Sequence, residues 1–163
     1  DLVCVSGAVG AAARGLAALR DCPEVLASVD VEPPVEIRPY LAPTPRLGLG
    51  AALRGLASAC VDVSDGLLAD AAQLARASGV AIELELARVP CVGARDAALV
   101  AGDDYELLFT IPAAEEGALA RLAEELDLAL TVIGRVTAGA GLVLRDGDHT
   151  VAAPAALGWK HFR

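Results

Sequence analysis

Basic and aromatic side chains are scarce in this sequence of 163 residues. Lysine occurs once, at Lys160, and only 3% of the residues are aromatic. Proteins that bind nucleic acids neutralise phosphates with clustered Lys and Arg, and those that hold single strands stack bases on aromatic rings. Because the chain has neither feature and a formal net charge of −9, we expect no nucleic-acid partner.

Long apolar runs and paired cysteines are absent as well. Charged residues interrupt every apolar stretch before it reaches the length of a membrane span, so we expect no membrane contact. No two cysteines form a C-x-x-C pair, which argues against a zinc site. We expect buried free thiols in a reducing cytoplasm at Cys4, Cys22, Cys60 and Cys91.

Small apolar residues are abundant instead. Hydrophobic residues make up 55% of the chain and the mean hydropathy is +0.53, which is enough for the core of one domain. The chain starts at Asp1 and contains no methionine, so we expect a domain cut from a longer protein.

Strands and helices are interspersed with connections of unequal length, which predicts an α+β fold with a mixed sheet flanked by helices. Residues 67–77 show the clearest helical spacing, with Asp70, Gln73 and Arg76 on the polar face and Gly79 as a left-handed end. Prolines make residues 23–45 an extended connection, with a short helix near 24–28. The other predicted helices cover 11–20, 46–56 and 112–126, and residues 91–100 are a loop plus a weak helix. The predicted strands cover 1–6, 58–63, 80–86, 105–111, 130–136, 142–145 and 150–152, and the last two form a hairpin around the turn at 146–148.

Two carboxylates three residues apart, Asp62 and Asp65, flank the junction between a predicted strand and a predicted helix. Aspartate oxygens suit Mg²⁺, and a helix start favours anions such as phosphate, so the segment can bring a metal to nucleotide phosphates. Taken alone, Ser64 and Asp65 are better explained as a cap for the helix.

Three further segments allow a similar choice between chemistry and structure. Asp103, Asp104 and Glu106 surround the start of a predicted strand and can bind a metal or a cationic substrate, or form a solvated turn. Gly7 and Gly10 can let the backbone approach a phosphate, or make a tight packing turn. Trp159 can stack on a planar ligand or a cation, or simply pack, and His161, two residues further on, is better explained as structural.

In combination and in order, these segments resemble thiamine-monophosphate kinase over essentially the whole chain. The resemblance rests on Gly7-x-x-Gly10, Gly15-Leu16-Ala17-x-Leu19, Pro45-Arg46, Asp62-x-Ser64-Asp65-Gly66-Leu67, Asp104-Tyr105-Glu106-Leu107-x-Phe109-Thr110, Ile133-Gly134-Arg135 and Gly158-Trp159-x-His161-Phe162. That family resembles the aminoimidazole ribonucleotide synthetase superfamily, whose C-terminal domain is a mixed sheet with flanking helices.

The resemblance implies transfer of the γ-phosphoryl group of ATP to thiamine monophosphate, with Mg²⁺ and without a covalent enzyme intermediate. It implies that Asp62 and Asp65 are metal ligands, that Ser64 touches ATP, and that Asp103 and Trp159 contact the substrate. The family usually has Glu at position 103, Tyr at 159 and often Asp at 11, where this chain has Asp103, Trp159 and Ala11.

The resemblance also implies that residues 1–163 are the C-terminal domain of a two-domain kinase. The N-terminal domain of such enzymes carries further metal-binding Asp residues and much of a homodimer contact, so we expect the chain alone to have little turnover. Two alternatives remain open: another ATP-dependent superfamily enzyme, of the cyclase or selenophosphate synthetase type, and a non-catalytic remnant domain.

Overall fold

A seven-stranded mixed sheet runs through the molecule in the order β2-β4-β1-β5-β3-β6-β7. The computed structural model describes residues 1–27 and 32–159. Only β3 and β6 are parallel neighbours, and all other adjacent strands are antiparallel. The strands are β1 (Leu2–Ser6), β2 (Ala59–Asp62), β3 (Ala81–Glu85), β4 (Leu107–Ile111), β5 (Leu130–Thr137), β6 (Gly141–Asp146) and β7 (His149–Val151).

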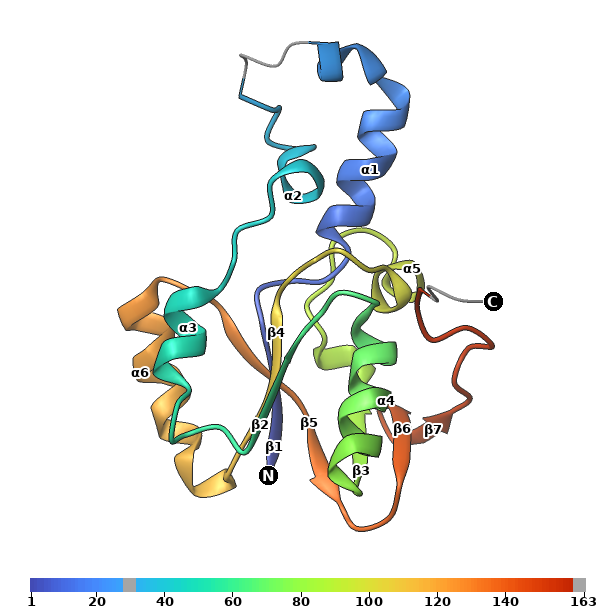
Figure 1. The fold of residues 1–163 in the computed structure, drawn as a ribbon. Helices are drawn as coiled ribbons and strands as arrows, with labels where there is room; N and C mark the ends of the chain where they lie inside the picture. The colour runs from blue at the N-terminus through green and yellow to red at the C-terminus, as the bar shows by residue number, and fades with distance from the viewer. Residues whose placement is uncertain (28–31, 160–163) are drawn as a thin grey trace.

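Helices cover both faces of this sheet, which gives three layers (Figure 1). The α-helices are α1 (Ala11–Asp21), α2 (Arg38–Leu41), α3 (Leu47–Ala52), α4 (Leu67–Ser78), α5 (Arg95–Val100) and α6 (Glu116–Leu126). Three short 3₁₀ helices are η1 (Pro23–Ala27), η2 (Leu86–Arg88) and η3 (Ala113–Glu115). The α+β fold expected from the sequence is therefore confirmed.

Two hydrophobic cores lie on opposite faces of the sheet. The larger core joins α4 and α5 to the sheet, and the smaller core joins α3 and α6 to β1 and β4. Side chains alternate along a strand, so Val3 and Val5 of β1 enter the larger core while Cys4 enters the smaller one. Burial on both faces explains why β1 is apolar from Leu2 to Val5 and lies near the middle of the sheet.

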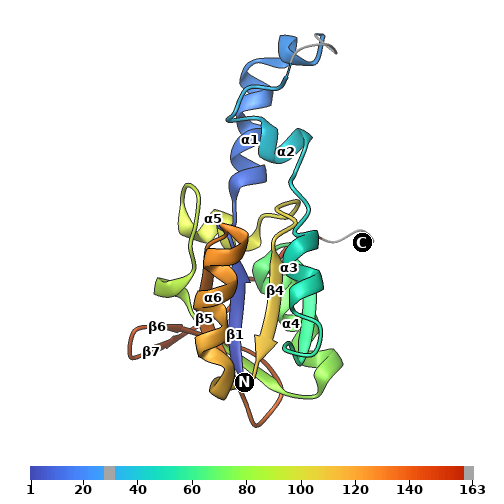
Figure 2. The same cartoon turned by 90° about the vertical axis from the view of Figure 1, so that its left-hand side faces the viewer.

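The segment from α1 to α2 projects from one end of the sheet as a helical arm, residues 11–27 and 32–42 (Figures 1 and 2). Its two helices make their main contacts with each other. Ala12, Leu19 and Ile37 are buried, whereas Val35 and Leu41 are exposed. The arm is thus a small unit of its own, joined to the body at its base.

Most predicted elements are confirmed within a few residues, and Gly79 ends α4 in the left-handed conformation as expected. The prolines of residues 23–45 do not keep that segment fully extended, because Pro39 stands at the start of α2, where its missing N–H has no cost. The strand predicted at 105–111 begins only at Leu107, because the backbone of Tyr105 is left-handed (φ 52°). The helix predicted at 112–126 starts as η3 and becomes α-helical at Glu116.

Two expectations about side-chain burial are wrong. Asp70 does not lie on the exposed face of α4 but is 3% exposed, because it accepts hydrogen bonds from the turn before the helix. Of the four thiols, only Cys4 is fully buried, and Cys22 and Cys60 are exposed because they lie at a helix end and on the edge strand β2. Burial raises the pKa of Cys4 to about 12.

Within residues 1–27 and 32–159, no helix combines the length and apolar character that crossing a bilayer requires.

Candidate functional site

The predicted site segments meet at one edge of the sheet. Strands β1 and β2 both run antiparallel to β4, so their last residues, Ser6 and Asp62, lie at the same edge as Leu107, the first residue of β4. Asp62 pairs directly with Leu107. This edge is also where the helical arm joins the body (Figure 1).

Backbone hydrogen bonds join the two acidic segments, although they lie about forty residues apart in the chain. The amide of Asp103 donates to Ser64 O at 2.9 Å, and that of Tyr105 donates to Val63 O at 2.9 Å. Val63 returns a bond to Glu106 O at 2.7 Å. The structure therefore brings the predicted ATP-binding Ser64 next to the predicted substrate-binding Asp103.

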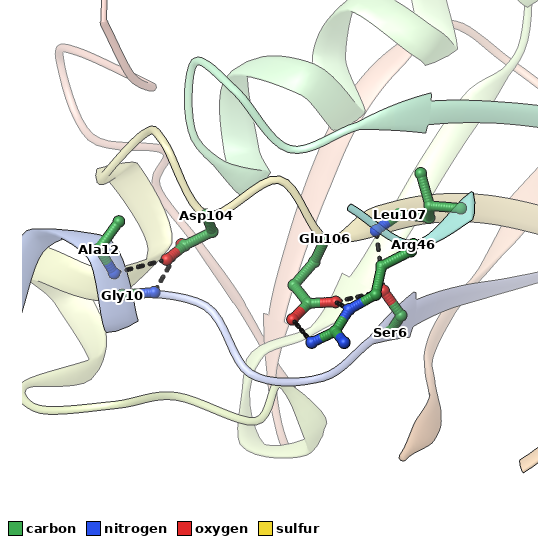
Figure 3. A network of polar contacts seen from close by, with 7 residues as sticks. All are labelled: Ser6, Gly10, Ala12, Arg46, Asp104, Glu106 and Leu107. Carbon is green, nitrogen blue, oxygen red and sulfur yellow. Dashed lines mark hydrogen bonds and ion pairs between the residues drawn. The ribbon is translucent and has the colours of Figure 1, made fainter. Parts of the chain in front are cut away.

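Asp104 caps helix α1 from across the sheet edge (Figure 3). Its carboxylate accepts from Gly10 N at 2.6 Å and from Ala12 N at 3.0 Å, two amides at the helix start that lack helical partners. Burial raises the pKa of Asp104 and the charge of Glu106 adds to this, while the amide hydrogen bonds favour the ionised form. Asp104 therefore holds the arm in place instead of pointing into open solvent.

Glu106 forms the centre of a buried polar network that the sequence did not single out as structural (Figure 3). Arg46 binds it through two hydrogen bonds, Nε to Oε2 at 2.8 Å and Nη2 to Oε1 at 2.6 Å. The Ser6 hydroxyl donates to Oε2 at 2.5 Å and accepts from Leu107 N at 2.8 Å. The sequence feature that could have indicated this network is Arg46 in the Pro45-Arg46 pair. Its guanidinium pairs with Glu106, the only buried Glu among the described residues.

Asp62, Asp103 and Tyr105 form the exposed part of the edge. Asp62 and Tyr105 line one hollow together with Arg46 and Arg54. The Tyr105 hydroxyl donates a long hydrogen bond, 3.4 Å, to Asp103 Oδ1. Asp103 and Tyr105 are both left-handed (φ 68° and 52°), a conformation that costs energy for residues other than glycine and clusters at functional sites. The charge of Asp103 also raises the pKa of the Tyr105 phenol.

Asp65 and Trp159 line a different hollow, between α4 and the C-terminal segment. The Trp159 amide donates to Asp65 O at 2.8 Å, and the indole is 66% exposed. Gln73 Nε2 donates to Asp65 Oδ2 at 3.4 Å. Two residues predicted for different roles, metal and substrate, thus share one hollow, whereas Asp62 lines another. His161 lies outside the described residues.

Gly7 and Gly10 are both left-handed, and each has a packing reason to be glycine. A Cβ on Gly7 would lie 2.3 Å from Glu106 Oε1, and one on Gly10 would lie 2.6 Å from the Cβ of Ala98. The amides of Gly7 and Gly10 already donate to Ala129 O and to Asp104. The geometry supports the packing interpretation of this turn, and a contact with phosphate remains a prediction.

The donors at this edge suit magnesium chemically. Aspartate and serine oxygens are hard ligands, and Mg²⁺ usually binds one or two carboxylates and takes its other ligands from phosphates and water. Among residues 1–27 and 32–159, no group of three or more His, Cys, Asp or Glu side chains is arranged to hold a metal ion. Asp62 and Asp65 carry oxygens of the kind that Mg²⁺ binds, but they line different hollows, so their role as metal ligands remains a prediction.

This chain, with its mixed sheet and acidic loops, can be compared with known domain families. The family model for the C-terminal domain of AIR synthase related proteins matches residues 7–147. The chain therefore belongs to this family.

Within that family the chain is similar to thiamine-monophosphate kinases, which confirms the resemblance found in the motifs. It is 36% identical to the enzyme of Escherichia coli K12 and 35% identical to that of Pyrococcus abyssi, over 99% of this chain and 51% and 50% of theirs. The chain spans about half the length of the curated relatives it matches.

Solved structures agree. A thiamine-monophosphate kinase from Stenotrophomonas maltophilia K279a superposes with a TM-score of 0.76 at 41% identity, covering 88% of this chain and 49% of that one. AaThiL complexed with AMPPCP and TMP superposes with a TM-score of 0.71 at 32% identity, covering 99% of this chain and 51% of that one. T. maritima PurL complexed with ATP superposes with a TM-score of 0.58 at 15% identity, which is a likeness of fold alone.

Proposed function

We propose that this chain supplies the C-terminal half of a thiamine-monophosphate kinase site. In the reaction, a phosphate oxygen of thiamine monophosphate attacks the γ-phosphorus of ATP, the bond from that phosphorus to the β–γ bridging oxygen breaks, and ADP leaves. The observation that carries the proposal is the hydrogen-bonded pairing of the Ser64 turn with the Asp103 loop at one sheet edge. The kinase relatives and the homologous complex with AMPPCP and TMP support it.

On the nucleotide side, we assign Asp62 and Asp65 as metal ligands and Ser64 as a contact to ATP. Bound Mg²⁺ would supply charge neutralisation for the phosphates. The chain positions the reactants: the turn at residues 64–66 is held by hydrogen bonds on both of its sides, so its side chains are preorganised.

On the substrate side, we assign Trp159 to the thiamine rings and Asp103 to a polar or cationic group of the substrate. The Trp159 indole is exposed and free to stack on a flat, positively charged ring system. Asp103 is exposed beside Tyr105, and its carboxylate is one methylene shorter than the Glu usual in the family.

We further propose that residues 1–163 form one domain that works with an N-terminal domain, in a homodimer in the cytoplasm. The size relation to the relatives and the incomplete set of metal donors support this arrangement. The N-terminal domain would bring the remaining acidic ligands.

The direct test is synthesis of thiamine pyrophosphate from thiamine monophosphate, ATP and Mg²⁺, comparing the full-length gene product with the 163-residue chain. We expect turnover in the full-length protein and little or none in the chain alone. Turnover by the chain alone would refute the two-domain arrangement. If neither protein turns over, substrates of the cyclase and selenophosphate synthetase types come next, and failure with those would favour a non-catalytic remnant.

Asp65→Asn tests the metal role in the full-length protein. Loss of a charged ligand removes several kcal/mol of charge stabilisation in the transition state, so we expect kcat to fall about 100-fold or more. The free energy of unfolding should change by less than about 1 kcal/mol, because the side chain is only half-buried in a turn. The matched control is Asp96→Asn, an exposed Asp in α5 whose loss should leave kcat unchanged. A wild-type rate in Asp65→Asn would contradict the assignment.

A further inference from the structure

Asp70 is a buried carboxylate that the proposed reaction has not used. It lies in the first turn of α4 and is 3% exposed. Its Oδ2 accepts from Ser64 N at 3.0 Å and from Asp65 N at 3.1 Å. Burying a charged group is costly unless hydrogen bonds compensate, so a carboxylate at this place must be matched to those two amides.

Hydrogen bonds hold this carboxylate, and no ion pair with another described residue does. In the part of the chain that the structure describes, none of the ion pairs involves Asp70. The N-cap residue of α4 is Gly66, which has no side chain to accept from the first amides. Asp70 instead accepts, from inside the helix, the amides of the two residues before this N-cap, and so it acts on the turn that carries Ser64 and Asp65.

That turn is a junction for the rest of the site. Ser64 O accepts from the amide of Asp103, and Asp65 O accepts from the amide of Trp159, at 2.9 Å and 2.8 Å. Asp70 accepts from the amides of the same two residues, and Asp65 N shares one peptide unit with Ser64 O. A shift of the turn would therefore move the nucleotide contacts and the substrate contacts together.

We propose that Asp70 is a positioning residue of the phosphoryl-transfer site: its carboxylate sets the orientation of the Ser64–Asp65 turn, and through it the reach of Asp65 and Ser64 toward magnesium–ATP. This proposal rests on the proposed kinase function. It differs from a purely structural role because it links Asp70 to turnover and to magnesium dependence, and not only to folding.

The test uses the full-length gene product with Asp70→Ala, Asp70→Asn and Asp70→Glu. Both amides bond to a single oxygen, Oδ2, which the Asn carbonyl can replace, so Asp70→Asn should retain most of the activity. Asp70→Ala leaves the amides without a partner, and we expect kcat to fall about 100-fold, the scale of a misplacement by about 1 Å. The magnesium concentration for half-maximal rate should rise, and KM for thiamine monophosphate should rise as well, because Asp103 and Trp159 bond to the same turn.

Glu85→Ala is the matched control. Glu85 also accepts two backbone amides, from Ala87 and Gly147, but does not contact the turn. It should leave kcat and magnesium dependence unchanged. If Asp70→Ala does not fold, Asp70→Glu keeps the charge but displaces the oxygen by one methylene, and a lowered kcat in that folded variant would support the proposal. Wild-type kcat and magnesium dependence in a folded Asp70→Ala or Asp70→Glu protein would overturn it.

Hydrogen exchange separates this proposal from the function itself. The amides of Ser64 and Asp65 should lose protection in Asp70→Ala and keep it in Asp70→Asn and Glu85→Ala, whether or not the protein phosphorylates thiamine monophosphate. If wild type shows no turnover but this pattern holds, the proposed function fails while the control of the turn by Asp70 stands. Unchanged protection of both amides in Asp70→Ala would disprove the claim that Asp70 orients the turn.

Discussion

At the scale of single residues, the pairing of Glu106 with Arg46 dominates the base of the site. The Glu106 side chain is 8% exposed and that of Arg46 is 26% exposed, so much of each charge is removed from water. A buried charge depends on its partner, because an unpaired one keeps the full cost of desolvation. The ion pair therefore anchors the segment at Arg46 to Glu106 at the edge of the sheet.

Glu106→Gln should lower the free energy of unfolding by roughly 3 kcal/mol, the lower end of the range for breaking a buried pair. Urea unfolding followed by circular dichroism measures the change. The control is Glu32→Gln, which breaks an exposed pair with Arg38 and should cost at most about 1 kcal/mol. Equal losses in the two variants would show that burial of the Glu106 pair has no special weight.

At the scale of elements, the loop before β4 and the turn before α4 depend on a close approach of backbones. A Cβ on Gly102 would lie 2.3 Å from Ser64 O, so only glycine lets the loop come close enough for the Asp103 amide to bond there. This contact holds the Asp103 loop against the turn that carries Ser64.

Gly102→Ala should therefore destabilise the chain by roughly 1–3 kcal/mol, the usual cost of overpacking. In the full-length protein it should also reduce turnover, because the loop moves away from Ser64. Gly117→Ala serves as the opposite case: Gly117 lies in α6 with nothing within 4 Å of a new Cβ, and the change should stabilise by up to about 1 kcal/mol. Thermal unfolding of both variants measures the difference, and the same sign of change in both would contradict this account.

At the scale of the whole molecule, the helical arm and the sheet differ in how they are held. The central strands are buried in two cores, whereas α2 contributes no buried residue of its own and the arm is tied to the body through Asp104 and Arg46. Regions with few buried contacts open locally at lower free energy than a core.

Backbone amides in α1 and α2 should therefore exchange with deuterium well before those in β1 and β4. Exchange measured by mass spectrometry or NMR on the 163-residue chain tests this. Asp104→Ala removes the cap on α1 and should speed exchange in the arm further, while β4 remains protected. Equal protection of the arm and the central strands would show that the arm is part of the main cooperative unit.

Much of the fold could be predicted because local signals agreed with the tertiary structure. Residues 67–77 had helical spacing and a glycine stop, and the turn at Asp146–Asp148 gave the hairpin of β6 and β7. Helix α2 could not be predicted, because Pro39 made a short helix look like extended chain. The start of β4 was predicted two residues too early. The backbone of Tyr105 is left-handed, and the residue type of a tyrosine does not indicate this conformation.

Composition and motifs were enough to indicate the fold class, the family resemblance and the acidic residues at Asp62, Asp65 and Asp103, because these depend on residue type, order and short spacing. Only the tertiary structure decided that Asp70 is buried under the Ser64 turn, that Arg46 reaches Glu106, and that Trp159 lies with Asp65. Arg46 with Glu106 and Trp159 with Asp65 join residues from different elements, and Asp70 is buried although it was predicted on the polar face of its helix. Burial and hydrogen-bond partners are properties of the folded chain that no local pattern encodes.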